Sequence, residues 1–244
     1  MDRDAEAYTE SFADVYDTWF GRMQNPDPVV ARLAALAGNG PILELGVGTG
    51  RIALPLQERG FHVKGIDASK AMIKQLKNKP GGTALPVTIG DFSEVPIEGK
   101  FSLVYAAAGT FFELPDQDAQ LRCFENVAKH LMPGGRFAFD SLVPEISRLG
   151  GSSGARLLPS TDEQTIVQFR QFDVAEQRYT SHYLIFADEG VRRMRVRFRY
   201  AWPGELDLMA RITGLRLVER TGTWDGAPFT NSSAYHVSVY ELPN

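Results

Sequence analysis

The sequence predicts an α/β protein whose doubly wound, mostly parallel seven-stranded sheet carries an antiparallel β insertion after the fifth strand. Three observations support this fold class. Between residues 41 and 140, short apolar runs alternate with segments of helical periodicity, as in parallel strands joined by helices on both faces. After residue 148 the pattern changes to period-2 runs separated by short turns, which is typical of an antiparallel meander. From residue 201 onward, one more helical segment and two strand-like runs complete the sheet.

Two helical segments precede the first expected strand. In the first, residues 5–20, four aromatic side chains fall at spacings of four, four and three, so they share one face of a helix that docks on the domain. These aromatic residues are Tyr8, Phe12, Tyr16 and Trp19. The second segment, residues 29–38, is expected to be a helix that ends at Gly38 or Gly40.

The alternating region is interpreted from its apolar runs, helix caps and glycine or proline stops. Its expected strands are residues 41–46, 61–67, 86–92, 101–109 and 136–140. Its expected helices are residues 51–60, 69–79 and 115–135. We expect Ser69 to cap the second of these helices, and Pro133 with the two glycines after it to end the third.

The insertion, residues 148–200, begins with a glycine- and serine-rich link and continues as a three-stranded meander. Its expected strands are residues 165–173, 177–186 and 192–202. In the third strand four arginines alternate with other residues and so share one face: Arg193, Arg195, Arg197 and Arg199. We expect this face to be solvated or to form a subunit contact, and the alternative is a surface for an anionic substrate. The chain then continues as a helix, residues 203–214, and two strands, residues 215–224 and 235–242.

The composition excludes several classes of protein. With 43% hydrophobic and 23% charged residues among 244, the chain is typical of a globular domain rather than a disordered or fibrous protein. Its net charge of −4 lacks the basic footprint of a dedicated nucleic-acid binder, so no nucleic-acid partner is expected. The single cysteine, Cys123, excludes a disulfide within the chain and a cysteine-cluster metal site, and a buried thiol fits a reducing cytoplasm. No run approaches the ~18 apolar residues of a membrane span, so we expect a cytoplasmic protein with no membrane partner.

The stretch "PILELGVGTGR", residues 41–51, places a glycine-rich turn between a strand and a helix. Such a turn lets the backbone approach a ligand closely. Its spacing is Gly46-x-Gly48-x-Gly50, and Arg51 stands where the third glycine of a dinucleotide fingerprint should fall. The lysine and hydroxyl residue that end a P-loop are also missing. Both phosphate-binding interpretations are therefore disfavoured.

Three carboxylates follow or flank this turn. Glu44 precedes the glycines, Asp67 ends the next strand, and Asp91 ends the strand after that. The carboxyl ends of adjacent parallel strands surround the crevice in which open α/β sheets bind ligands. Acidic groups there suit a ligand with a positive charge, ribose hydroxyls and an adenine amine, and S-adenosylmethionine has all three.

These residues resemble class I S-adenosylmethionine-dependent methyltransferases over roughly residues 8 to 140 and the last two strands. The resemblance implies that Gly46, Gly48 and Gly50 wrap the methionine part of the cofactor and that Glu44 supports their loop. It implies further contacts at the ribose and the adenine: Asp67 to the ribose hydroxyls, Met72 beside the adenine, Asp91 to its amino group, with Ala68, Phe92 and Ala106 completing the cofactor site. It also implies a cofactor-binding core at residues 41–147 and 201–244.

The N-terminal "AYTESFADVYD" is similar to the lid helix of methyltransferases that act on amino sugars and related natural-product precursors. The resemblance implies a helical lid over residues 1–40. In those relatives a tyrosine at the position of Tyr8 closes over the cofactor carboxylate, and Tyr16 belongs to a recurrent Tyr-Asp pair. The resemblance also implies that the insertion covers the substrate or forms a dimer contact.

The function expected is methyl transfer to an N or O atom of a small molecule, such as a sugar or secondary-metabolite precursor. Glu113, just past the fourth strand, is the candidate to face the acceptor, and Tyr8 is the second catalytic candidate. Some sugar N-methyltransferases carry a histidine near the acceptor, so the acceptor atom stays open. The alternatives are an NAD(P)- or flavin-dependent oxidoreductase and a non-catalytic S-adenosylmethionine-binding protein. No His or Cys spacing indicates a metal site, and the meander could support a homodimer.

Overall fold

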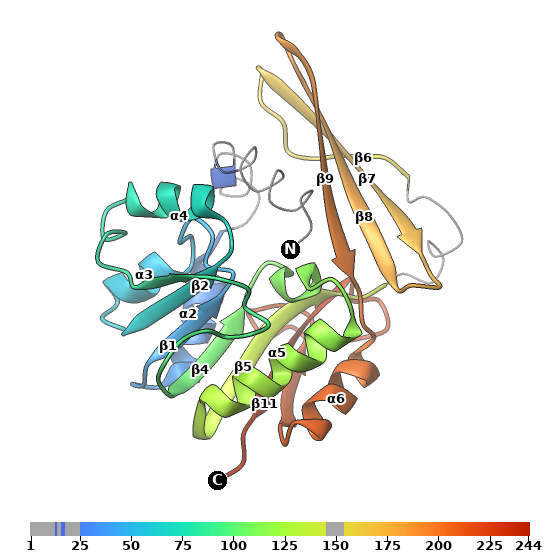
Figure 1. Ribbon diagram of the computed structural model, residues 1–244. Coiled ribbons are helices and arrows are strands. Elements are labelled where there is room, and N and C mark those ends of the chain that lie inside the picture. Colours follow the sequence, from blue (N-terminus) through green and yellow to red (C-terminus); the bar gives the residue numbers. More distant parts are fainter. Residues whose placement is uncertain (1–12, 14–15, 18–24, 145–153) are drawn as a thin grey trace.

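The computed structural model describes residues 13, 16–17, 25–144 and 154–244 of the chain. Tyr8, Phe12 and Trp19 of the expected aromatic helix lie outside the described residues, as does most of the glycine- and serine-rich link. Figure 1 shows the main sheet between two layers of helices, with a second, smaller sheet above it.

The main sheet has seven strands in the order β10-β11-β5-β4-β1-β2-β3. The strands are β1 (Ile42–Leu45), β2 (Val63–Asp67), β3 (Val87–Ile89), β4 (Phe101–Ala106), β5 (Leu131–Leu142), β10 (Arg216–Thr221) and β11 (Tyr235–Glu241). The pairs among β1 to β5 are parallel, and β11 pairs antiparallel with both β5 and β10. The predicted fold class, a mostly parallel seven-stranded sheet with an antiparallel insertion after β5, is confirmed.

Two groups of helices cover the two faces of this sheet (Figure 1). One face carries α2 (Asp27–Ala37), α3 (Ala53–Glu58) and α4 (Lys70–Lys77), and the other carries α5 (Gln117–His130) and α6 (Pro203–Ile212). Successive strand residues point to opposite faces, so Ile42 packs with the first group while Leu43 and Leu45 pack with the second. Cys123 of α5 is fully buried in that second core, as predicted.

Helix boundaries were predicted well where a local cap sets them. The Ser69 hydroxyl accepts a hydrogen bond from the Met72 amide at 3.2 Å, which is the predicted cap of α4. The end of α5 was predicted wrongly. This helix stops at His130 rather than near Pro133, because Leu131 is already extended and pairs with Phe101 of β4.

The insertion is a four-stranded antiparallel sheet, here called the meander, in the order β6-β7-β8-β9. Its strands are β6 (Arg156–Leu157), β7 (Gln164–Asp173), β8 (Arg178–Ala187) and β9 (Gly190–Arg199), of which the two-residue β6 was not expected. In Figure 1 it rises above the carboxyl ends of the parallel strands. Its inner face packs with Ala13 and with Met72 of α4 in one apolar cluster. The meander therefore contacts both the N-terminal segment and the core.

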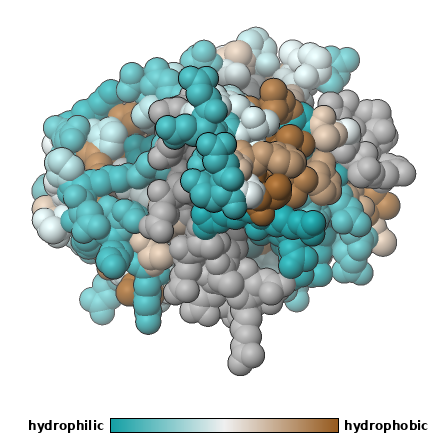
Figure 2. Space-filling view, turned by 90° about the horizontal axis from the view of Figure 1, so that it is seen from above, coloured by the Kyte–Doolittle hydropathy of each residue, from teal (hydrophilic) through white to brown (hydrophobic). Residues whose placement is uncertain are grey.

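The outer face of the meander carries most of the predicted arginine row. Arg193, Arg195 and Arg197 are exposed, as expected. Arg199 is only 5% exposed and donates hydrogen bonds to Gln120 and Glu205, so placing it on the solvated face was wrong. β9 enters the core at its last residue, Arg199, and the alternation of side chains along the strand does not predict this. Seen from above, the molecule is largely hydrophilic with one compact apolar patch (Figure 2).

None of the helices in the described ranges is long and apolar enough to cross a membrane.

Candidate functional site

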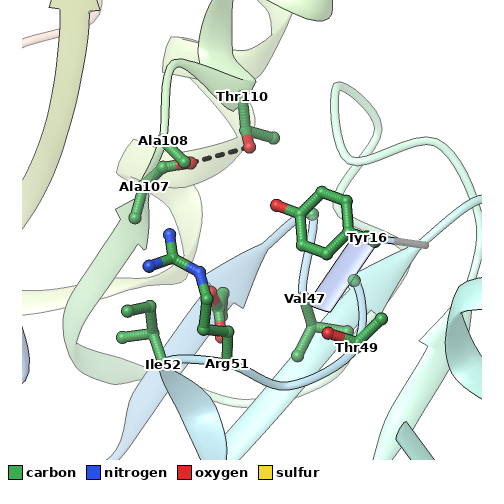
Figure 3. Close-up of a pocket in the computed structure, with 11 residues that line it drawn as sticks. Tyr16, Val47, Thr49, Arg51, Ile52, Ala107, Ala108 and Thr110 are labelled. Carbon is green, nitrogen blue, oxygen red and sulfur yellow. Dashed lines mark hydrogen bonds between the residues drawn. The ribbon is translucent and has the colours of Figure 1, made fainter. Parts of the chain in front are cut away.

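A hollow that is partly open to solvent lies where β1 and β4 end (Figure 3). It is lined by the glycine loop, the segment after β4 and one residue of the N-terminal segment: Tyr16, Glu44, Gly46, Val47, Gly48, Thr49, Arg51, Ile52, Ala107, Ala108 and Thr110. Such a position, outside the carboxyl ends of parallel strands, is where open α/β sheets bind ligands. We call it the main pocket.

The glycine loop has a backbone that other residues adopt only with strain. Gly46, Gly48 and Gly50 have φ of +72°, +53° and +78°. A Cβ on Gly46 would lie 2.3 Å from Cγ2 of Thr110, whereas a Cβ on Gly48 would meet nothing within 4 Å. The loop therefore packs tightly beneath Gly46 and leaves bare backbone at Gly48, where a ligand can approach.

Asp67 ties the end of β2 to this loop. Its carboxylate accepts hydrogen bonds from the amides of Gly48 at 2.7 Å and Ser69 at 2.8 Å. Burial raises the pKa of Asp67, and these backbone hydrogen bonds oppose the rise. The carboxylate is thus held beside the glycine loop, as sequence reasoning expected of a residue at the carboxyl end of this strand.

Glu44 lies beneath the loop and is 4% exposed. Its Oε2 atom has no hydrogen-bond partner among the described residues. Burial raises the pKa of Glu44 to about 8, and the nearby Tyr105 hydroxyl and Arg51 oppose the rise. A buried carboxyl with an unused acceptor at the wall of a pocket favours a ligand that brings a positive charge or a hydrogen-bond donor.

Arg51 is a pocket residue that the sequence analysis noted only as a departure from the dinucleotide fingerprint. Figure 3 shows its guanidinium and the Tyr16 hydroxyl directed into the same space. Its charge lowers the pKa values of Glu44 and Asp140, while burial raises the pKa of Tyr16 to about 12. The pocket therefore places a guanidinium near the buried carboxyl of Glu44, an arrangement suited to a ligand with charges of both signs.

A short polar network holds the N-terminal segment against the glycine loop. Asp17 accepts a hydrogen bond from the Thr49 hydroxyl at 2.6 Å and pairs with Lys79 at 2.6 Å. Lys79 also donates to the backbone oxygen of Thr49 at 2.8 Å. Because Asp17 follows Tyr16 directly, this network fixes the tyrosine that covers the main pocket.

The segment after β4 is held by a carboxylate that sequence reasoning missed. Asp140, near the end of β5, accepts hydrogen bonds from the Ala108 amide at 2.7 Å and from the Trp224 indole at 3.2 Å. Burial raises the pKa of Asp140 to about 6, against the lowering effect of these hydrogen bonds. Ala108 has φ of +62°, a left-handed conformation that is strained for alanine. Asp140 thus fixes a strained turn at the pocket wall.

Glu113 ends the short 3₁₀ helix η1 (Thr110–Glu113), whose first residue lines the main pocket. Water reaches the Glu113 side chain, yet protein surrounds it closely enough that burial raises its pKa to about 7, with a further contribution from Asp67. In turn Glu113 raises the pKa values of Tyr16 and Tyr179. Glu113 is therefore close to Tyr16 of the main pocket and to Tyr179 of the meander.

The other predicted cofactor residues do not line the main pocket, and neither do Gly50 and Asp67. Met72 is 5% exposed in the cluster under the meander, and Ala68 follows Asp67 directly. Asp91 is exposed and accepts from the Ser93 amide at 2.8 Å, while Phe92 packs on the core. Ala106 is fully buried, and the next two residues line the pocket instead. Tyr8 lies outside the described residues, and within the described ranges no cluster of three or more His, Cys, Asp or Glu could hold a metal ion.

Comparison with known proteins gives a consistent result. The Methyltransferase domain family matches residues 42–135. The chain is 28% identical over 242 residues to the Cypemycin N-terminal methyltransferase of Streptomyces sp, covering 98% of each protein. It is 36% identical to the CcbJ methyltransferase of Streptomyces caelestis, whose structure superposes with a TM-score of 0.89 over 97% of this chain and 98% of that one.

A more distant structure shares the fold. The amino pentose methyltransferase of Micromonospora echinaspora, involved in calicheamicin biosynthesis, has a TM-score of 0.71 at 18% identity, over 93% of this chain and 96% of that one. These similarities give no support to a nicotinamide or flavin oxidoreductase.

Proposed function

The chain belongs to the class I S-adenosylmethionine-dependent methyltransferases, and on that premise we propose that it methylates an amine nitrogen of a small natural-product precursor. The observation that carries this proposal is a carboxyl with a raised pKa, Glu113, at the end of the 3₁₀ helix whose first residue lines the main pocket. A relative that matches 98% of the chain is named as an N-terminal methyltransferase, which adds support for nitrogen as the acceptor atom.

The residues of the main pocket, together with Asp67 beside the glycine loop, fit S-adenosylmethionine. The unused acceptor of Glu44 and the carboxylate of Asp67 suit a cation and ribose hydroxyls, and Arg51 suits a carboxylate. Bare backbone at Gly48 allows close approach. When bound, the cofactor supplies an electrophilic methyl group on a positively charged sulfur. We propose that Tyr16 covers it, held by the network of Asp17.

Glu113 is proposed as the base that frees the acceptor lone pair. An amine is largely protonated near neutral pH, since α-amino groups have pKa values of about 8 and lysine-like amines about 10. A carboxylate whose pKa is about 7 is ionised just above neutrality and differs little from an α-amine in proton affinity. An alcohol holds its proton far more strongly. Glu113 is therefore better matched to an amine than to a hydroxyl.

The rest of the chemistry is positioning. Methyl transfer needs the acceptor lone pair in line with the methyl carbon and water kept away. Tyr16, the strained turn at Ala108 and the inner face of the meander would form the walls that do this. The small-molecule acceptor would bind beside η1, which contacts β9 of the meander.

Calorimetric titration with S-adenosylhomocysteine, the demethylated product, tests the cofactor site. We expect saturable binding to the native protein and at least a tenfold weaker Kd for Asp67→Ala. Asp118→Ala, an exposed aspartate on α5, is the matched control and should bind as the native protein does. If the folded native protein shows no binding, the proposed function fails.

A further inference from the structure

The inner face of the meander carries a charged residue among apolar and aromatic ones. Side chains alternate along a strand, so Arg170 of β7 shares its face with Gln168 and Phe172, and the register sets it opposite Ser181 of β8. Gln168 is buried and donates to the Tyr183 hydroxyl at 2.9 Å. This is the face that turns toward the core rather than toward solvent.

Three tyrosines surround Arg170. Its guanidinium carbon lies 5.6 Å from the centre of the Tyr179 ring, a cation–π contact. Tyr235, the first residue of β11, hydrogen-bonds the Arg170 side chain, and Tyr183 lies near enough to raise the pKa of Arg170. These residues come from β7, β8 and β11, so the cluster lies where the meander meets the main sheet. We call it the arginine–tyrosine cluster.

This cluster shares Tyr179 with the surroundings of Glu113. Tyr179 belongs to the apolar core that also contains Phe111 and Phe112 of η1, the helix that Glu113 ends. Both Glu113 and Arg170 act electrostatically on Tyr179. Tyr179 is therefore close to both a guanidinium and a carboxylate.

From this arrangement we propose that Arg170, with Tyr179 and Tyr235, binds a carboxylate of the methyl acceptor, so that the enzyme selects amines that also carry an acid group. A guanidinium presents paired donors that match the two oxygens of a carboxylate, and a half-buried site strengthens that interaction. The inference rests on the proposed function for the identity of the ligand, because it assigns the amine end of the same acceptor to Glu113. The acceptor class is then an amino acid or a molecule with an amino-acid end.

The test measures binding rather than turnover. Three acids of increasing reach serve as probes: L-phenylalanine, L-phenylalanyl-glycine and L-phenylalanyl-glycyl-glycine, each paired with its C-terminal carboxamide. Dissociation constants are measured by calorimetry on the native enzyme saturated with S-adenosylhomocysteine. We expect at least one acid to bind ten or more times more tightly than its amide. If no acid is preferred, or none binds, the proposal is overturned.

Variants then assign the preference to the cluster. Arg170→Gln should reduce the acid-to-amide ratio to within twofold of one while leaving S-adenosylhomocysteine affinity within twofold of native. Arg170→Lys, which keeps the charge and is less disruptive, should retain a ratio above three. Arg195→Gln, on the exposed outer face of the same sheet, is the control and should keep the native ratio. A native ratio in Arg170→Gln would overturn the assignment.

The two proposals fail separately. If the enzyme methylates amines but binds acid and amide equally, the arginine–tyrosine cluster is not an acid site while the proposed function stands. If it prefers acids yet transfers a methyl group to no amine, the acid site stands and the proposed function fails.

Discussion

Replacing Asp140 with alanine should weaken cofactor binding although Asp140 does not line the main pocket. Asp140 accepts hydrogen bonds from the Ala108 amide at 2.7 Å and the Trp224 indole at 3.2 Å. Asp140→Ala removes both. Ala108 lines the pocket and has φ of +62°, so its wall depends on a strained conformation that this carboxylate holds.

The expected effect follows from the strain at Ala108. A left-handed conformation costs an L-residue roughly 1–2 kcal/mol. Without Asp140, a cost of about 1.4 kcal/mol would leave the pocket-forming turn populated about one time in ten, so the apparent Kd would rise about tenfold. The unsatisfied amide should also lower the free energy of unfolding by roughly 1–3 kcal/mol. Relief of the buried charge, whose pKa is raised to about 6, offsets part of that loss at neutral pH.

A second substitution distinguishes loss of the turn at Ala108 from a general destabilisation of the protein. Glycine adopts the left-handed conformation readily, so Asp140→Ala with Ala108→Gly should recover S-adenosylhomocysteine affinity to within about threefold of native. Calorimetry gives the affinities and urea unfolding gives the stabilities. Native affinity in Asp140→Ala, or no recovery in the double variant, would refute the role assigned to the turn.

Three further outcomes test other parts of the site. Gly46→Ala should abolish cofactor binding, because its Cβ would collide with Thr110. Gly48→Ala has open space around its Cβ and should cost only the backbone strain of roughly 1–2 kcal/mol. Equal cofactor affinities for the two variants would contradict this. For native enzyme kcat/KM should rise as pH approaches 7 and level above it, as Glu113 ionises, and Glu113→Gln should lose that rise. The pKa of Glu113 is raised from 4.5 in the folded protein, so the protonated side chain stabilises the fold below pH 4.5 and this contribution is lost as the pH rises to 7. Denaturant titrations should therefore show the free energy of unfolding of Glu113→Gln rising relative to that of the native protein between pH 4.5 and 7. Arg199→Met should lower the free energy of unfolding by about 1–3 kcal/mol, because it leaves the buried Gln120 side-chain oxygen without a donor and removes the ion pair with Glu205. A loss under about 0.5 kcal/mol by urea titration would argue against these contacts.

The sequence predicted the features that local chemistry determines. Alternating strands and helices, the Ser69 cap and the buried Cys123 are confirmed because each depends on neighbouring residues or on burial patterns. The glycine loop was recognised because glycine at every second position is needed mainly where the backbone has positive φ, as it has at all three glycines. Its role in cofactor binding remains a prediction.

Features that depend on contacts between distant segments were not predicted. The end of α5 is set by pairing of Leu131 with β4, and Arg199 is buried by α5 and α6. Asp140 ends a strand-like run in the sequence, as Asp67 does, so the same rule could have found it. Its partner Trp224, however, lies 84 residues away in the chain. Arg51 was visible in the motif, but only the fold places its charge among buried carboxyls.

The transfer of a labelled methyl group tests the central claim most directly. The enzyme is incubated with S-adenosylmethionine labelled in its methyl group and with amines paired with the corresponding alcohols, and the products are identified by mass spectrometry and NMR. We predict label on nitrogen of the amine, matched one for one by S-adenosylhomocysteine, and none on the alcohols. Label on oxygen, or no transfer by a protein that binds the cofactor, would contradict it.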